Sequence, residues 1–241
     1  MVIIKTPDFS IEYKDIILVD HSPLEHYHDS FELAFFINAQ LHIFVKDINY
    51  SLKGGDMLFI DEYDIHRMVY NPNSTYARYV INFRKGFILP FLNYLKIETI
   101  LNDLKTIPFK KASLNLKQTT EMESLFKNLL KLNGKIANEY QPAITSALIK
   151  SYLLIILSKL KMFINQNKAD VPDTKNLKVQ AIVQYIDGHY MSPLSLDKLQ
   201  EVFNISKFHI SHIFKEVTGF TVTEYIQYRR IIEAQKMLKS K

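Results

Sequence analysis

The chain has 241 residues, of which 47% are hydrophobic and 23% charged, a formal net charge of +5, and no cysteine. This length and hydrophobic content predict two modest globular domains and exclude a disordered chain. The lack of cysteine excludes disulfides, thiol nucleophiles and cysteine metal sites.

No apolar run in the sequence is long enough to suggest a transmembrane segment. The longest run begins at Tyr152 and is interrupted by Ser158, Lys159 and Lys161, well short of a membrane-spanning length. The N-terminus carries acidic residues early and lacks an apolar region followed by a small-residue cleavage site. We therefore expect a cytoplasmic protein with no membrane partner.

Positive charge is concentrated in the last third of the chain. Residues 175–241 carry ten Lys and Arg against six Asp and Glu, a net charge of +4, whereas residues 1–174 carry twenty against nineteen, a net charge of +1. Lys and Arg that neutralise phosphates release condensed counterions, so a basic segment favours nucleic-acid binding. A solvated basic surface would have the same composition, so charge alone leaves both interpretations open.

From about Ile11 to Leu116 the sequence has the pattern of a β-domain. Short runs rich in β-branched and aromatic residues alternate with turn-like clusters of Asp, Asn and Gly. Gly54 and Gly55 lie between two of these runs and predict a β-hairpin, because glycine reaches the positive φ angles of tight turns. Residues 86–104 interrupt the pattern and predict a short helical segment.

Residues 118–165 predict two helices, because apolar residues recur at spacings of three and four. Their apolar positions outnumber those needed to cover one small β-domain, which leaves two interpretations: pairing with a second copy, or packing on the β-domain. The segment 165–176 is polar, contains Pro172 and lacks periodicity, which is typical of a linker. We therefore divide the chain into a β-domain (1–117), a helical segment (118–167), a linker (168–176) and a C-terminal domain (177–241).

The C-terminal domain is expected to be helical throughout. A first amphipathic helix is predicted over residues 177–187. Ser195 and Ser206 are placed to cap a second and a third helix, and only two residues separate these helices, a spacing typical of a helix-turn-helix. Gly219 is placed to end the third helix, and a long fourth helix is predicted from about Val222.

The third helix is predicted to bury one side and expose the other. Hydroxyl and imidazole groups on an exposed helix face can hydrogen-bond base edges in the major groove, an aromatic ring can contact thymine methyls, and lysines can contact phosphates. A helical hairpin with no nucleic-acid role is the alternative. The predicted buried stripe is Ile210, Ile213, Phe214 and Val217, and the predicted exposed set is Lys207, Phe208, Ser211, His212 and Lys215.

The run "ISKFHISHIFKEVTGFTVTEYIQYRRIIEAQKML" resembles the DNA-binding domain of the AraC/XylS family of bacterial transcription regulators. The order of hydroxyl cap, aromatic residue, Phe-Lys, Thr-Gly, Tyr-Ile and an Arg-bearing helix is more restrictive than a general helix-turn-helix pattern. The resemblance implies base contacts from Phe208, Ser211 and His212, and it implies dimerisation through residues 118–165. The DNA-binding set is completed by Lys207, Lys215, Arg229 and Arg230.

The resemblance is incomplete at the C-terminal end. Family members continue after the connecting helix into a second helix-turn-helix, whereas this sequence ends at "MLKSK". Losing one groove contact removes phosphate and base contacts, so we expect weak DNA binding by a single copy. A chain cut at that helix, a naturally shortened protein, and a shortened protein that pairs with and inhibits an intact relative are three explanations.

The β-domain resembles the cupin barrel, which AraC-like regulators often carry as a sensor. "HYHDSFE" places His26, His28 and Glu32 at even spacing, so on a regular strand all three point to one face. His66 matches the later histidine of the second cupin motif, although the usual Pro and Gly before it are missing. The four side chains could bind a divalent transition metal, but interior histidines without a metal are the favoured interpretation.

The expected fold is therefore α+β and multi-domain, with a cupin-like β-barrel, a helical dimerisation segment and a C-terminal all-α domain. The expected function is DNA-binding transcription regulation without enzymatic activity or a cofactor, controlled by a small effector inside the barrel. Arg78 can point inward and pair with a carboxylate or sugar hydroxyls of that effector. The alternatives are an interaction protein that inhibits an intact regulator, and a metal-dependent cupin enzyme. The effector set comprises His26, His28, Glu32, His66 and Arg78.

Overall fold

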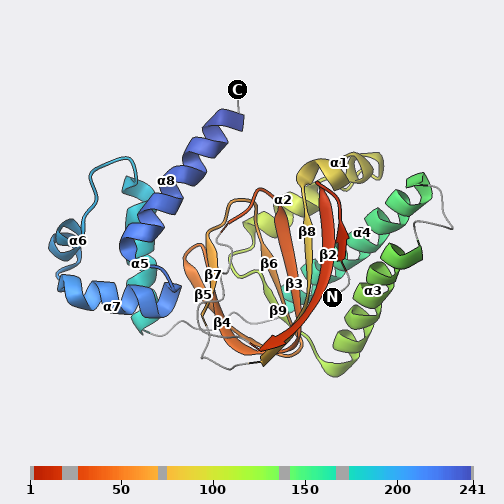
Figure 1. The fold of residues 1–241 in the computed structure, drawn as a ribbon, viewed down its shortest axis with the longest axis horizontal. Helices are drawn as coiled ribbons and strands as arrows, with labels where there is room; N and C mark the ends of the chain where they lie inside the picture. Colours follow the sequence, from red (N-terminus) through yellow and green to blue (C-terminus); the bar gives the residue numbers. More distant parts are fainter. Residues whose placement is uncertain (1–2, 18–26, 70–74, 136–141, 167–173, 240–241) are drawn as a thin grey trace.

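The computed structural model describes residues 3–17, 27–69, 75–135, 142–166 and 174–239 (Figure 1). Within these ranges, every helix falls short of the length and apolar character needed to cross a membrane. Two sheets and two pairs of helices make up the first two thirds of the chain, and four helices form a separate group beside one of the sheets (Figure 1).

The N-terminal strands form two antiparallel sheets. One has six strands in the order β1-β2-β8-β3-β6-β9, and the other has three in the order β5-β4-β7. The bounds are β1 (Ile3–Lys5), β2 (Phe9–Ile17), β3 (Phe31–Asn38), β4 (Gln40–Val45), β5 (Ile48–Lys53), β6 (Asp56–Ile60), β7 (His66–Val69), β8 (Thr75–Phe83) and β9 (Lys111–Ser113).

The prediction of a closed barrel is wrong for the described part of the chain, where the two sheets remain separate. They pack through alternate residues of β3 instead of closing edge to edge. Leu33 and Phe35 point into one core, whereas Ala34 and Phe36 point into a second core that contains residues of the three-stranded sheet. Because both faces of β3 are covered, its residues 33–37 form a continuous apolar run.

The predicted hairpin at Gly54 and Gly55 is also wrong. β5 pairs with β4, whereas β6 pairs with β3 and β9, so the two glycines connect one sheet to the other. Glycine is still required there, because Gly55 has φ 87° and a Cβ on Gly54 would lie 2.8 Å from the carbonyl oxygen of Ile37. The hairpin in this region joins β4 to β5, with Lys46 in the left-handed region at φ 59°.

The helical segment predicted within residues 86–104 is present as α1 (Lys85–Tyr94) and α2 (Thr99–Thr106). The two helices predicted over residues 118–165 are present as α3 (Leu116–Lys135) and α4 (Pro142–Gln166). Both pack on the six-stranded sheet, where the Phe126 ring lies 5.4 Å from Phe35 and 5.5 Å from Tyr79. The buried faces of α3 and α4 therefore pack on the β-domain, which is one of the two interpretations that the sequence left open.

The C-terminal helices are α5 (Thr174–His189), α6 (Leu196–Phe203), α7 (Lys207–Thr218) and α8 (Val222–Lys239). Ser195 and Ser206 cap α6 and α7 as predicted, since each side chain accepts a hydrogen bond from the backbone N–H three residues later. Gly219 ends α7 in the left-handed conformation, as predicted. α5 starts at Thr174, inside the predicted linker.

The helices α5–α8 dock on the three-stranded sheet (Figure 1). Phe44 of β4 lies in the core of the helical group, with its ring 6.4 Å from Phe220 and 6.1 Å from Tyr225. The hydroxyl of Tyr225 donates to the carbonyl of Lys46 at 3.2 Å, and Gln184 donates to the Asp47 carboxylate at 3.0 Å. The turn between β4 and β5 is therefore a contact between the two parts of the molecule.

Candidate functional site

The predicted recognition face of α7 is directed away from the protein core. Ile210 and Phe214 are fully buried, whereas Phe208 is 82% exposed on the opposite side. Ser211 is half-buried beside it. A ring with this exposure contributes little to the core and is accessible to a partner. The other exposed members of the predicted set are Lys207, His212 and Lys215.

Side chains at the N-terminal end of α7 are already paired with neighbouring polar groups. The Lys207 ammonium lies 3.1 Å from the Asp197 carboxylate, and the backbone N–H of Lys207 donates to Gln200 at 2.9 Å. The Lys207–Asp197 pair is exposed and can be exchanged for a phosphate at small cost. The α6–α7 turn is thereby fixed, which holds the exposed face in one orientation.

The structure places Arg229 and Arg230 differently from the α7 residues. Arg229 forms an ion pair with Asp187 at 3.2 Å and stacks over the Tyr190 ring at 5.1 Å. Arg230 donates to the backbone carbonyls of Tyr190 at 2.8 Å and Ser192 at 3.0 Å. Both guanidinium groups of α8 therefore hold the segment between α5 and α6. This segment leads into α6, so the two arginines help to position the helix pair α6–α7.

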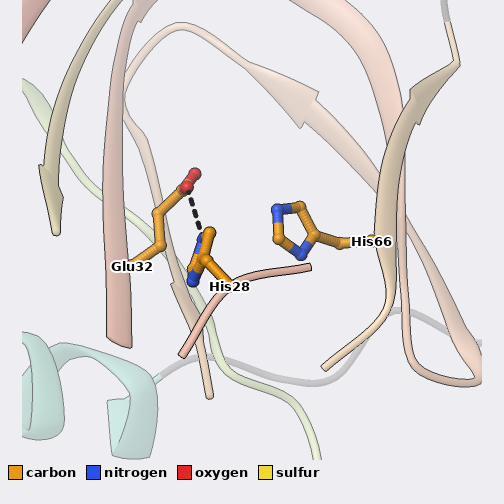
Figure 2. Close-up of side chains that lie close together, drawn as sticks. All are labelled: His28, Glu32 and His66. Atoms are coloured by element: carbon orange, nitrogen blue, oxygen red, sulfur yellow. Dashed lines mark hydrogen bonds and ion pairs between the residues drawn. The ribbon is translucent and has the colours of Figure 1, made fainter. Parts of the chain in front are cut away.

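A buried polar cluster lies between the two sheets of the N-terminal domain (Figure 2). His28 Nε2 is 3.2 Å from Glu32 Oε2, the His28 and His66 rings are 5.0 Å apart, and Arg78 Nη1 is 3.6 Å from Glu32 Oε1. Arg78 points inward, as the sequence suggested, and is 8% exposed. His28 lies before the start of β3 at Phe31. His28 and Glu32 are therefore not brought together by lying on one regular strand, as their even spacing suggested. His26 lies outside the described residues.

The environment of the cluster sets the charges of its members. Burial raises the pKa of Glu32, but the hydrogen bond from His28 and the nearby Arg78 and His66 together outweigh it, so the net pKa lies well below the ordinary range. Burial lowers the pKa of His66, against an opposing effect of Glu32. The cluster therefore contains an ionised carboxylate beside a neutral imidazole at neutral pH.

The orientation of both imidazoles fits a metal ion. His28 Nδ1 donates to the Ser30 carbonyl at 2.7 Å and His66 Nδ1 donates to the Asp64 carbonyl at 2.9 Å, so in each ring the other nitrogen, Nε2, can ligate a metal. For His28 this requires loss of the Nε2 proton that it donates to Glu32. One ring nitrogen from each histidine and one Glu32 oxygen lie within 4.8 Å of one another. Two imidazoles and a carboxylate suit zinc, nickel or iron. Because Arg78 already neutralises Glu32, a further ligand with negative charge would fit best.

The depressed pKa of His66 predicts that stability falls as the pH is lowered below about 6.5. In this window the unfolded chain takes up a proton at His66 that the folded chain does not, so the free energy of unfolding drops by up to about 1.4 kcal/mol per pH unit. Urea denaturation at pH 7.0 and 5.5 should show this loss, and His66→Gln should reduce the difference between the two pH values.

A matched control is His42→Gln, which changes an exposed histidine on β4. The control should keep the pH dependence of the unmodified chain. If His66→Gln leaves the difference between pH 7.0 and 5.5 unchanged, protonation of His66 is not its cause. Glu32 does not contribute to the difference between pH 7.0 and 5.5. Its pKa is lowered by folding, so the stability that it provides is lost only when the pH falls below the ordinary carboxyl pKa range.

Several residues that join the two parts of the molecule were not identified from the sequence. Arg67 donates to the Gly219 carbonyl at 2.6 Å and stacks over the Phe220 ring at 3.9 Å. Tyr27 accepts a hydrogen bond from Gln235 at 3.2 Å. The strand alternation that points His66 inward places Arg67 on the opposite face, and this is the signal that could have indicated its role.

Comparison with known proteins identifies the N-terminal domain. The family described as "AraC-like ligand binding domain" matches residues 9–149. This range covers most of both sheets together with α3 and the start of α4.

Individual relatives include a protein described as a transcriptional regulator. The chain is 21% identical over 237 residues to the uncharacterized HTH-type transcriptional regulator YfiF of Bacillus subtilis (strain 168), covering 98% of this chain and 73% of YfiF. It is 34% identical over 67 residues to the multiple antibiotic resistance protein MarA of Escherichia coli (strain K12), covering 28% of this chain and 53% of MarA. A crystal structure of apo ToxT from Vibrio cholerae aligns with 9% identity and a TM-score of 0.44, covering 92% of this chain and 98% of ToxT.

Proposed function

The chain belongs to the AraC family of transcription regulators, and we propose that it binds double-stranded DNA through the exposed face of α7 and responds to a small effector held in its N-terminal domain. Phe208, Ser211 and His212 contact base edges in the major groove, and Lys207 and Lys215 contact phosphates. Arg229 and Arg230 contribute indirectly, because they hold the segment between α5 and α6.

The observation that carries this proposal is the exposure of one face of α7 while its other face is buried in the core of the helical group. The opposite side of α7 is buried, its N-terminus is capped by Ser206, and Phe208 remains 82% exposed. The docked sheet contacts the C-terminal end of α7 at Gly219, away from Phe208. A duplex can therefore approach the N-terminal end of α7 without displacing the N-terminal domain.

We also propose that the chain forms homodimers through the outer face of α4. Ile144, Ile155 and Met162 are 48%, 42% and 59% exposed although the opposite face of α4 packs on the sheet. Their spacing along the helix places them on one side. A dimer would raise the effective concentration of the second DNA-binding unit and so increase affinity for a site with two half-sites.

The buried cluster of His28, Glu32, His66 and Arg78 is the proposed effector site. It combines hydrogen-bonding and charged groups inside a domain that the family match describes as ligand-binding. Arg78 has an Nε atom without a hydrogen-bond partner in the described part of the chain, and a polar effector could accept from it.

DNA binding by α7 predicts different effects for base-contacting and phosphate-contacting residues. With DNA from the region upstream of its own gene, Phe208→Ala and His212→Ala should each weaken specific binding by about 1–3 kcal/mol and reduce the preference over unrelated DNA. Lys215→Gln should weaken binding to all sequences and lower the slope of log affinity against log salt by about one. Fluorescence anisotropy at several salt concentrations measures both quantities.

Lys111→Gln provides the control, because Lys111 lies on β9 and its ammonium donates to the Ser51 carbonyl at 3.1 Å. It removes one positive charge outside the helices α5–α8, so its salt slope should match that of the unmodified chain. Equal weakening by Lys111→Gln and Lys215→Gln would show non-specific charge attraction and would argue against the α7 face.

A further inference from the structure

Two segments beside the buried cluster each present one side to the cluster and the other side to α8. In the first segment, His28 points to Glu32 and His66 (Figure 2). Its neighbours Tyr27 and Asp29 point the other way: Tyr27 accepts from Gln235 at 3.2 Å, and Asp29 accepts from Lys239 at 2.6 Å. Alternation along an extended chain explains why adjacent residues serve different sides.

The second segment, residues 63–67, repeats this arrangement. His66 points into the cluster, whereas Tyr63 accepts a hydrogen bond from Lys239 at 3.0 Å and Ile65 lies in the core shared with α7 and α8. Arg67 completes the outer side through its 2.6 Å hydrogen bond to Gly219. Every second residue of this segment therefore contacts the helical group.

The two segments are also bonded to each other. The backbone N–H of Tyr63 donates to the carbonyl of His28 at 2.9 Å, and Lys239 contacts Asp29 from one segment and Tyr63 from the other. A movement of His28 relative to His66 must therefore change the spacing of the groups that hold the end of α8.

We propose that a divalent transition-metal ion bound by His28, Glu32 and His66 draws these two segments together and tightens the docking of α7 and α8 on the N-terminal domain. The ligand atoms now lie within 4.8 Å of one another, whereas pairs of ligands in a tetrahedral zinc site lie about 3.4 Å apart. This inference rests on the proposed function, since it names the effector and the path by which it acts on the DNA-binding helices.

The coupling requires no chain of intermediate residues. Tyr27 and Asp29 are covalent neighbours of His28, and Ile65 and Arg67 are covalent neighbours of His66. The ion favours the docked arrangement to the extent that it binds more tightly when both segments are in place. Arg67 is a positioning residue in this scheme, because it contacts Gly219 and Phe220 and lies outside the ligand set.

The test uses the full 241-residue chain, Co²⁺ or Zn²⁺ alone, and two readouts that involve no DNA. The absorption spectrum of Co²⁺ reports coordination, and hydrogen exchange followed by mass spectrometry reports protection of α7 and α8. We expect one ion per chain and several-fold slower exchange of amides in residues 207–239 when Zn²⁺ is added. His28→Gln should abolish both effects, and His66→Gln provides a second variant if the first does not fold.

Two further variants separate the site from the coupling. His42→Gln changes an exposed histidine on β4 and should leave Co²⁺ binding and the change in exchange as they are. Arg67→Ala keeps all three ligands, so it should still bind Co²⁺ but lose most of the slowing near Gly219. If His28→Gln and His66→Gln both still bind Co²⁺, the metal site is wrong. If the unmodified chain binds the ion but its amides in α7 and α8 exchange at the same rate or faster, the coupling is wrong. Anisotropy of the metal-free chain on DNA tests the proposed function separately, so either can fail without the other.

Discussion

Replacing Glu32 by glutamine is expected to lower the free energy of unfolding by about 3–5 kcal/mol, the typical cost of breaking a buried ion pair by removing one partner. Glu32 is 6% exposed and its carboxylate lies 3.6 Å from Arg78 and 3.2 Å from His28. Glutamine keeps the size of the side chain but removes the negative charge, so the Arg78 guanidinium remains buried without a counter-ion. Urea denaturation at pH 7 measures the loss.

Two controls separate this effect from general sensitivity to charge. Glu62→Gln removes a carboxylate that lies 3.0 Å from Lys105, whose side chain is 31% exposed. Because this pair is partly solvated, the variant should lower the free energy of unfolding by less than about 1 kcal/mol. The double variant Glu32→Gln, Arg78→Met removes both charges and should recover much of the stability lost in the single variant. If Glu32→Gln and Glu62→Gln cost the same, Glu32 does not serve as the counter-ion of Arg78.

Gly219→Ala is expected to destabilise the chain by about 2–4 kcal/mol and to weaken the docking of the helical group. Gly219 has φ 76°, a conformation that costs an L-residue about 1–2 kcal/mol. An added Cβ would lie 2.6 Å from Cδ of Arg67, so Arg67 must move from the Phe220 ring and from the Gly219 carbonyl. A charge-assisted hydrogen bond of this kind is worth about 1.5–3 kcal/mol.

Gly188→Ala is the matched control for this prediction. Gly188 lies in α5, and a Cβ added there meets no atom within 4 Å among the described residues. Alanine is a better helix former than glycine, so this variant should gain about 0.5–1 kcal/mol. Thermal unfolding followed by circular dichroism should move in opposite directions for the two variants. A shift of the same sign and size for both would contradict the role assigned to Gly219.

The candidate sites were predictable to different degrees. The exposed face of α7 followed from helical periodicity, and the structure places Phe208, His212 and Lys215 on it. The cluster was predicted through its residue types, and the structure brings His28, Glu32, His66 and Arg78 together, although His28 precedes β3. The role of Arg230 could not be predicted, because its partners are backbone carbonyls between α5 and α6. Arg229 pairs with Asp187 on another helix and with Glu233 one turn along α8, and only the second of these contacts is local in sequence.

Local features of this chain depend on short stretches of sequence and were therefore predictable. Helix caps at Ser195 and Ser206, the end of α7 at Gly219 and the presence of two helices within residues 118–165 each follow from side chains within a few residues of one another. The family resemblance also depended on such a local run, and the family match supports it.

Only the tertiary structure determined which strands share a sheet and which surfaces meet. Gly54 and Gly55 have the composition of a hairpin turn, but they connect two sheets, because β5 and β6 find their partners in distant strands. The buried faces of α3 and α4 could have met a second copy as well as the six-stranded sheet. Strand alternation places Arg67 on the face opposite His66 but does not identify its partners, since its contacts with Gly219 and Phe220 span more than 150 residues of sequence. Burial of apolar area is non-directional, so the sequence sets how much surface must be covered, and long-range packing decides what covers it.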